Sequence, residues 1–155
     1  MFLVSAEVGP FKSINEPQKV DIEEDVTVFV GMNEAGKTVF LKALEKSYDI
    51  LSTAKFDPIE DYPRKDLPSY LREHKRNPAI AASLAYRLTN EEIAGLNDEF
   101  DTNLESGFTF SVSPKYDNGR TINMSINERP VIDSLIARSQ LSSDALGALE
   151  NAKSI

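Results

Sequence analysis

Cysteine is absent from this chain, and histidine occurs once, at His74. The first absence excludes a disulfide framework and a thiolate metal site. A single histidine also excludes a histidine-rich zinc centre. No apolar run approaches the roughly 20 residues that a membrane helix needs, and residues 1–7 lack the basic start and apolar core of a secretory signal. We therefore expect a cytoplasmic protein with no membrane partner.

Basic residues are fewer than acidic residues in this chain. The 155 residues include 17 Lys and Arg against 25 Asp and Glu, which gives a net charge of −8. This balance opposes non-specific nucleic-acid binding by the chain as a whole. The hydrophobic content of 41% and the charged content of 27% are ordinary for a globular protein. The length is sufficient for one domain with a real core.

Residues 31–38 carry the most specific motif of the chain. They read Gly-Met-Asn-Glu-Ala-Gly-Lys-Thr, which is the G-x-x-x-x-G-K-T pattern of a phosphate-binding loop. The glycines allow the backbone to curl around a phosphate chain with its N–H groups pointing inward. Lys37 supplies a positive charge for the β- and γ-phosphates, and Thr38 offers a hydroxyl to Mg²⁺. The motif predicts a nucleoside triphosphate and Mg²⁺ as ligands.

The segments on both sides of the motif fit a strand–loop–helix unit. Residues 26–30 (Val-Thr-Val-Phe-Val) are apolar and β-branched, which predicts a buried strand. The residues after the motif predict a helix that continues to Leu51. Its apolar stripe is Phe40, Leu44, Tyr48 and Leu51. The dipole of that helix points its positive end at the bound anion.

The rest of the chain is read from its periodicity. Alternation predicts further strands, which are residues 2–8, 18–24, 81–88, 108–112 and 122–126. Asp117-Asn118-Gly119 predicts a hairpin between the last two of these. Helices are predicted within residues 67–76, from the Thr89/Glu92 capping box through Phe100, and over residues 131–155.

The N-terminal part resembles the ATP-binding heads of the family that contains RecF, the structural-maintenance-of-chromosomes (SMC) proteins and the overcoming-lysogenisation-defect (OLD) nucleases. These heads are relatives of ABC-type ATPases. The likeness is carried by residues 11–14 (Phe-Lys-Ser-Ile), residues 28–31 (Val-Phe-Val-Gly) and residues 33–44, and it covers about the first fifty residues. Asp61-Tyr62-Pro63-Arg64 is a further similar segment, and residues 85–92 are similar more loosely.

The resemblance implies roles for particular residues. The phosphates and Mg²⁺ would be held by the loop and the helix start, with Thr38 as the metal ligand. Lys12 and Ser13 would lie near the base or ribose, although Lys12 also fits an exposed loop lysine. The complete set of expected ligand-binding residues is Lys12, Ser13, Gly31, Asn33, Glu34, Ala35, Gly36, Lys37, Thr38 and Val39.

Several motifs of a hydrolytic head are missing. Such a head needs an apolar strand that ends in Asp and Glu, which order Mg²⁺ and the attacking water. The nearest match is Val131-Ile132-Asp133, but Pro130 precedes it and Ser134 follows. The Ser-Gly-Gly-Gln signature and the later switch histidine have no match, and Gln140 is the candidate for a further family glutamine. The catalytic residues are therefore unknown, and we expect little turnover by this chain alone.

We expect an α/β fold: the N-terminal lobe of a phosphate-loop ATPase head, with a mixed sheet around the loop helix and an antiparallel portion. It would form one partial domain with a core (1–51), a loop-rich excursion (52–80), antiparallel strands with one helix (81–130) and a helical segment (131–155). The implied partners are the missing C-terminal half of the head, a second head joined through ATP, and DNA through the complete assembly. The implied roles are DNA repair, chromosome organisation or phage-defence nuclease action. A non-catalytic nucleotide-gated interaction module and a small-molecule phosphotransferase are the alternatives.

Overall fold

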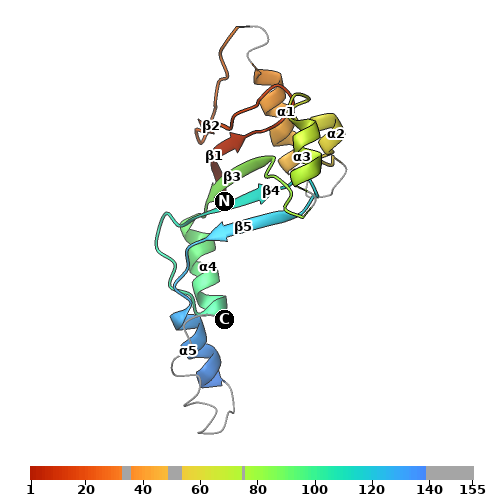
Figure 1. Ribbon diagram of the computed structural model, residues 1–155. Coiled ribbons are helices and arrows are strands. Elements are labelled where there is room, and N and C mark those ends of the chain that lie inside the picture. The colour runs from red at the N-terminus through yellow and green to blue at the C-terminus, as the bar shows by residue number, and fades with distance from the viewer. Residues whose placement is uncertain (33–35, 49–53, 75, 139–155) are drawn as a thin grey trace. The chain divides into compact units, whose positions relative to one another are not determined.

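The computed structural model describes residues 1–32, 36–48, 54–74 and 76–138. The chain divides into two compact units (Figure 1). One unit comprises Phe2–Arg87 with Thr109–Asn123, and the other comprises Met1, Leu88–Phe108 and Met124–Ile155. The first unit contains the phosphate-loop motif.

A five-stranded sheet has the order β2-β1-β3-β4-β5. The pairs β1–β2, β1–β3 and β3–β4 are antiparallel, and β4 and β5 are neighbours joined by a tight turn. All five strands fall within or overlap segments that alternation predicts, although β2 is shorter than expected. The strands are β1 (Phe2–Val8), β2 (Gln18–Asp21), β3 (Ala82–Arg87), β4 (Thr109–Pro114) and β5 (Arg120–Met124).

The Asn-Gly hairpin prediction is confirmed. Asn118 has φ of 63°, a left-handed conformation that asparagine tolerates. The N–H of Lys115 donates to the carbonyl of Gly119 at 2.9 Å and closes the turn. The Asn118 side chain also exchanges two hydrogen bonds with the backbone of Phe56, at 2.8 and 3.1 Å. The turn therefore anchors the loop-rich excursion as well as joining two strands.

One face of the sheet is covered by helix α1 (Lys37–Tyr48), which packs against β1 and β3. The register places Ala6 opposite Leu84 and Val8 opposite Ala82, and all four side chains are buried. Alternate residues of neighbouring strands thus share the core face, as the two-residue period requires.

The buried stripe of α1 differs from the predicted one. Phe40, Ala43 and Ser47 are buried, whereas Tyr48 is 64% exposed. Residues spaced by four drift around a helix of 3.6 residues per turn, so Tyr48 has rotated out of the face that contains Phe40. The buried Ser47 hydroxyl is satisfied because it donates to the Ala43 carbonyl at 2.7 Å. Leu51 lies outside the described residues.

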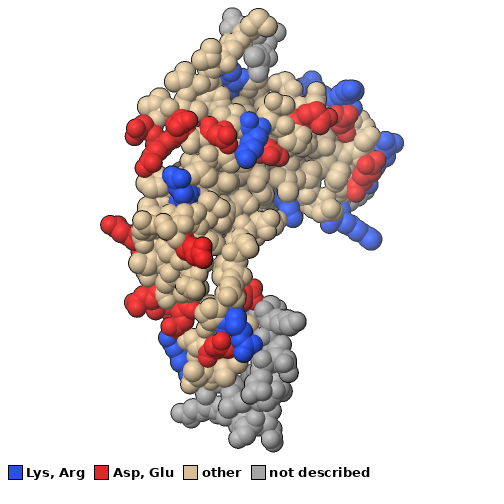
Figure 2. Space-filling model, turned by 90° about the vertical axis from the view of Figure 1, so that its left-hand side faces the viewer, with Lys and Arg blue, Asp and Glu red and all other residues tan. Residues whose placement is uncertain are grey.

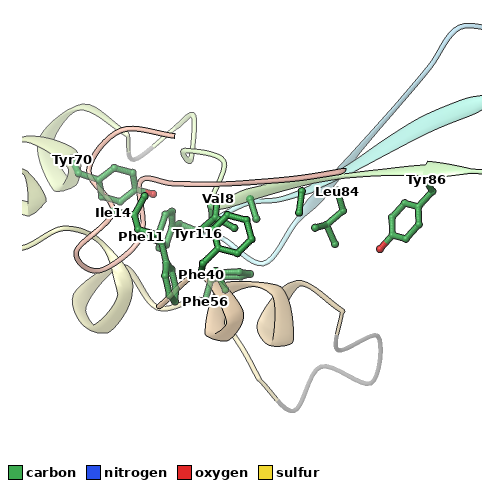
Figure 3. Close-up of a cluster of buried hydrophobic side chains, with 13 residues drawn as sticks. Val8, Phe11, Ile14, Phe40, Phe56, Tyr70, Leu84, Tyr86 and Tyr116 are labelled. Atoms are coloured by element: carbon green, nitrogen blue, oxygen red, sulfur yellow. The ribbon is translucent and has the colours of Figure 1, made fainter. Parts of the chain in front are cut away.

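The loop-rich excursion contributes two short helices and several aromatic rings to the core. The helices are α2 (Pro58–Asp61) and α3 (Leu67–Glu73), and the second confirms the helix predicted within residues 67–76. Phe56 makes edge-on contacts with Phe11 and Tyr116, both with ring centroids 5.9 Å apart. Figure 3 shows these rings with Phe40 between the strands and the helix. Long-range aromatic packing, rather than regular structure, thus fixes this segment.

The predicted strand at residues 26–30 is wrong. These residues have no strand assignment, and Val26, Val28 and Val30 are 71%, 72% and 89% exposed. No backbone–backbone hydrogen bond joins them to another described residue. A β-branched run becomes a strand only where a neighbouring strand completes the ladder, and the described part of the chain offers none. For the same reason the mixed sheet around the loop helix is not observed, and the sheet is antiparallel.

This exposure predicts a contrast between two valines. We expect Val28→Thr to change the free energy of unfolding by less than about 0.5 kcal/mol, because the hydroxyl stays in water. Val8→Thr in β1 should cost about 1–3 kcal/mol, because its hydroxyl would be buried without a partner. Urea unfolding followed by circular dichroism measures both changes. An equal loss in the two variants would mean that residue 28 is buried in solution.

The second unit contains helices α4 (Asn90–Phe100) and α5 (Arg129–Arg138). The capping box is confirmed, since Glu92 N–H donates to the Thr89 hydroxyl at 3.2 Å and Thr89 N–H donates to the Glu92 carboxylate at 2.9 Å. The helix predicted over residues 131–155 is observed as α5 as far as Arg138, and the remainder, with Gln140, lies outside the described residues.

The hydropathy of the helices and the surface charge can also be described. Over the described ranges, no helix is long and apolar enough to cross a membrane. Figure 2 shows that acidic and basic side chains are interspersed on one face of the molecule.

Candidate nucleotide-binding site

A cavity of about 560 Å³ opens beside the start of α1. Three segments line it: the turn and strand after β1, Phe29 and Val30 at the end of the 26–30 segment, and the first residues of α1 with Gly36 before them. Its volume lies within the usual range for small-molecule sites. The lining residues are Ser13, Ile14, Asn15, Glu16, Gln18, Val20, Phe29, Val30, Gly36, Lys37 and Phe40.

The second glycine of the motif adopts the conformation that the loop needs. Gly36 has φ of +85°, which L side chains rarely adopt. Its carbonyl accepts the Phe40 N–H at 2.8 Å, so the helix begins directly after this residue. The N-terminus of a twelve-residue helix therefore meets the cavity. Asn33, Glu34 and Ala35 lie outside the described residues, and Gly31 is exposed.

Lys37 points its ammonium across the beginning of the loop. Nζ donates to the carbonyls of Gly31 at 2.5 Å and Met32 at 2.7 Å. An ammonium has three N–H donors, so these two bonds leave one for an anion. Lys37 also lines the cavity and thus brings a positive charge to its wall.

Thr38 and Val39 differ in position although they are neighbours. Thr38 lies in the first turn of α1 and is exposed, and it is not among the residues that line the cavity. From this position its hydroxyl can reach a metal ion held mainly by phosphate oxygens and water. Val39 packs against the hydrophobic core and is not among the lining residues. The described residues contain no cluster of three or more acidic, histidine or cysteine side chains that could hold a metal by itself.

Ser13 and Lys12, although adjacent in sequence, make different contacts. Both lie in a tight turn closed by paired 2.8 Å hydrogen bonds between Phe11 and Ile14. Ser13 lines the cavity. Lys12, with φ of 49°, points elsewhere: Nζ lies 3.0 Å from Asp61 Oδ1 and donates to the Glu60 carbonyl at 3.1 Å. The structure thus brings Ser13 together with Gly36 and Lys37, but pairs Lys12 with a carboxylate.

Asp61 belongs to a segment that resembles the ATPase heads, but no sequence pattern indicated that its charge is buried. It is 0% exposed, and Oδ2 accepts hydrogen bonds from Lys46 Nζ at 2.5 Å and Asp57 N–H at 3.0 Å. Oδ1 has Lys12 as its ionic neighbour but accepts no well-aligned hydrogen bond among the described residues. Burial raises the pKa of Asp61, yet the Asp57 N–H and the two ammonium groups outweigh it and hold the pKa below its ordinary value of 3.8.

The described lining residues give the cavity a positively charged side and an apolar side. Lys37 and the helix N-terminus favour an anion, and Phe29 and Phe40, whose ring centroids are 5.4 Å apart, supply an apolar wall. Glu16 is the one carboxylate among the described lining residues. Asp133, from the nearest match to the second catalytic motif, lies in helix α5 and pairs with Arg129 at 2.9 Å. That segment is not the strand that the motif requires.

Comparison with known proteins finds likenesses among solved structures. No protein-family description matches the chain, and no curated protein matches it. A similar solved structure comes from work on the "Structural biochemistry of ATP-driven dimerization and DNA stimulated activation of SMC ATPases". It has 14% sequence identity and a TM-score of 0.41, over 98% of this chain and 93% of that one. A likeness at this level establishes neither the family nor the function of the chain.

Proposed function

We propose that this chain is a nucleoside-triphosphate-binding lobe, with ATP and Mg²⁺ as its ligands, of a RecF-, SMC- or OLD-type ATPase. One observation carries the proposal: Gly36 and Lys37, at the start of α1, line the same 560 Å³ cavity as Ser13. A phosphate loop, a helix N-terminus and a polar turn converging on one cavity fit a triphosphate. Thr38 would contact the Mg²⁺ that the phosphates hold. The motif implies that Asn33, Glu34 and Ala35 also take part in holding the phosphates.

Lys12 and Val39 enter this proposal in supporting roles. Lys12 faces Asp61, so any contact with a base or ribose would be made by Ser13, its neighbour along the chain. Val39 packs on the core and would fix the first turn of α1. The ligand itself would meet Gly31, Gly36 and Lys37.

The partner of the proposed lobe would complete the sheet at residues 26–30. Three valines of this segment are exposed, and its backbone makes no backbone–backbone hydrogen bond within the described part of the chain. A strand from the other half of an ATPase head would satisfy both features. In the assembled protein, ATP would join two heads, and the assembly would act on DNA in repair, chromosome organisation or phage defence.

Lys37→Ala tests the ligand assignment. We expect the affinity for MgATP to fall by about 100-fold, because a charge-assisted contact with the phosphates is lost. Lys42→Ala is the matched control, since Lys42 is exposed on the same helix and does not line the cavity. Titration with a fluorescent ATP analogue measures both variants. Equal affinities of Lys37→Ala and the wild type would refute the proposed function.

A non-catalytic module that binds nucleotide to gate a partner is the second candidate. The observation that favours it is the single carboxylate, Glu16, among the described lining residues, since hydrolysis needs groups that order both the metal ion and the water. Hydrolysis by the purified chain that disappears in Glu16→Gln would count against this candidate. Transfer of phosphate to a small acceptor would instead favour a phosphotransferase. No feature of the described residues supports that third alternative.

A further inference from the structure

We infer that Asp61 is a positioning residue, which holds the two walls of the nucleotide cavity at a fixed separation. The inference rests on the proposed function, because it concerns the same cavity. Asp61 does not line that cavity. It pairs with two lysines that do not line the cavity but lie in the two elements that carry its walls, Lys12 in the turn beside Ser13 and Lys46 in α1.

The carboxylate joins the two elements that carry these walls, the turn at residues 11–14 and helix α1. Oδ1 lies 3.0 Å from Lys12 Nζ, and Oδ2 lies 2.5 Å from Lys46 Nζ. The Asp61 side chain is fully buried, whereas those of Lys12 and Lys46 are 34% and 25% exposed. Water therefore screens the carboxylate poorly, and its geometry is set by the two ammonium groups.

The first wall is held by backbone as well as by charge. Lys12 N–H donates to the Asp61 carbonyl at 2.6 Å, and the Tyr116 hydroxyl lies 3.2 Å from that carbonyl and 2.6 Å from the Pro10 carbonyl. Ser13 follows Lys12 directly and is itself a lining residue. A shift of residue 12 would therefore shift the polar turn of the cavity.

The second wall is the helix that begins with Lys37. Lys46 is nine residues further along α1, which corresponds to about 13 Å of helix axis. Its ammonium also donates to the Lys55 carbonyl at 2.9 Å. A helix is stiff over this length, so anchoring Lys46 fixes the position of Lys37 and Gly36 relative to Ser13. Burial of a charged group at this point is then explained by alignment, because a buried ion pair adds little stability over an apolar replacement.

The test is a double-mutant cycle on MgATP affinity. We expect Asp61→Asn to weaken binding by about tenfold and Lys12→Met by a similar factor, through misplacement of the polar turn. The double variant should bind as weakly as either single variant, because both remove the same link. Lys12→Arg should retain affinity within about twofold, since arginine can still pair with the carboxylate. Asp66→Asn, an exposed aspartate without a side-chain cap bond, is the control for the charge change.

The outcomes separate the inference from the proposed function. If the wild type binds MgATP and depends on Lys37, but Asp61→Asn binds equally well at the same folded fraction, the positioning role is overturned alone. Additive losses in the double variant would mean that Lys12 touches the ligand itself, which also overturns it. If Asp61→Asn does not fold, Lys12→Met and Lys12→Arg are compared instead. Weaker MgATP binding by Lys12→Met together with unchanged binding by Lys12→Arg supports the inference. Equal MgATP affinities of these two variants overturn it. Absence of binding by the wild type would end both proposals.

Discussion

Phe11→Ala should lower the free energy of unfolding by about 3–5 kcal/mol, the usual cost of removing a buried phenyl ring. Phe11 is 0% exposed. Its ring meets Phe56 edge-on with centroids 5.9 Å apart and planes at 82°, and the Lys12 ammonium lies 5.5 Å from its centroid. The truncation would leave a cavity between the first turn and the loop-rich excursion. Urea unfolding followed by circular dichroism measures the loss.

Tyr48→Ala is the control for this experiment. Tyr48 is also aromatic and lies in the same unit, at the end of α1, but it is 64% exposed. We expect a loss of less than about 1 kcal/mol, as for most surface substitutions. Similar losses in the two variants would contradict the burial of Phe11 in the core.

Asp61→Ala should cost about 3 kcal/mol at pH 7. The substitution leaves two ammonium groups close together without their counter-charge, and it removes the acceptor of the Asp57 N–H. Asp66→Asn, an exposed aspartate five residues along the chain, should change stability by less than about 0.5 kcal/mol. Chemical unfolding at pH 7 compares the two, and an equal effect would show that the Asp61 pairs contribute nothing.

The pH dependence of the Asp61 contribution has a definite sign. Burial opposes ionisation of the carboxyl, but the Asp57 N–H and the lysines hold its pKa below the ordinary value of 3.8. A carboxyl whose pKa is depressed by folding contributes stability above its unfolded pKa and loses it as the pH falls through its folded pKa. The difference in stability between the wild type and Asp61→Ala should therefore be constant from pH 7 to about pH 5 and shrink below pH 3.8. A difference that grew on acidification would contradict the assignment of the charged state.

Elements whose signal is local could be predicted from the sequence. Alternation locates the segments of all five strands, the Thr89/Glu92 pair locates the start of α4, and Asn118 locates the hairpin. In each case the deciding interactions are made by neighbours in sequence or by a two-residue period. The motif at residues 31–38 likewise predicts a tight glycine turn and a helix beside it, and Gly36 has a positive φ at the start of α1.

Long-range interactions could not be predicted in this way. The buried carboxylate of Asp61 pairs with Lys12 and Lys46, which lie far from it along the chain. Nothing in the local sequence around these residues indicates the two ion pairs. The strand prediction at residues 26–30 fails for a related reason. An apolar β-branched run has the same pattern whether or not the chain supplies a neighbouring strand.

The backbone of residues 26–30, which makes no backbone–backbone hydrogen bond to another described residue, has a consequence for the aggregation of the purified protein. Together with the next two residues it forms a seven-residue window, Val-Thr-Val-Phe-Val-Gly-Met, with no charge and no proline, which is the composition that favours fibril growth. The preceding residues, Glu23, Glu24 and Asp25, are all exposed and can act as gatekeepers that keep such windows apart by repulsion. Neutralising them should make concentrated samples turn turbid and bind amyloid dyes, even though the fold itself would be unaffected.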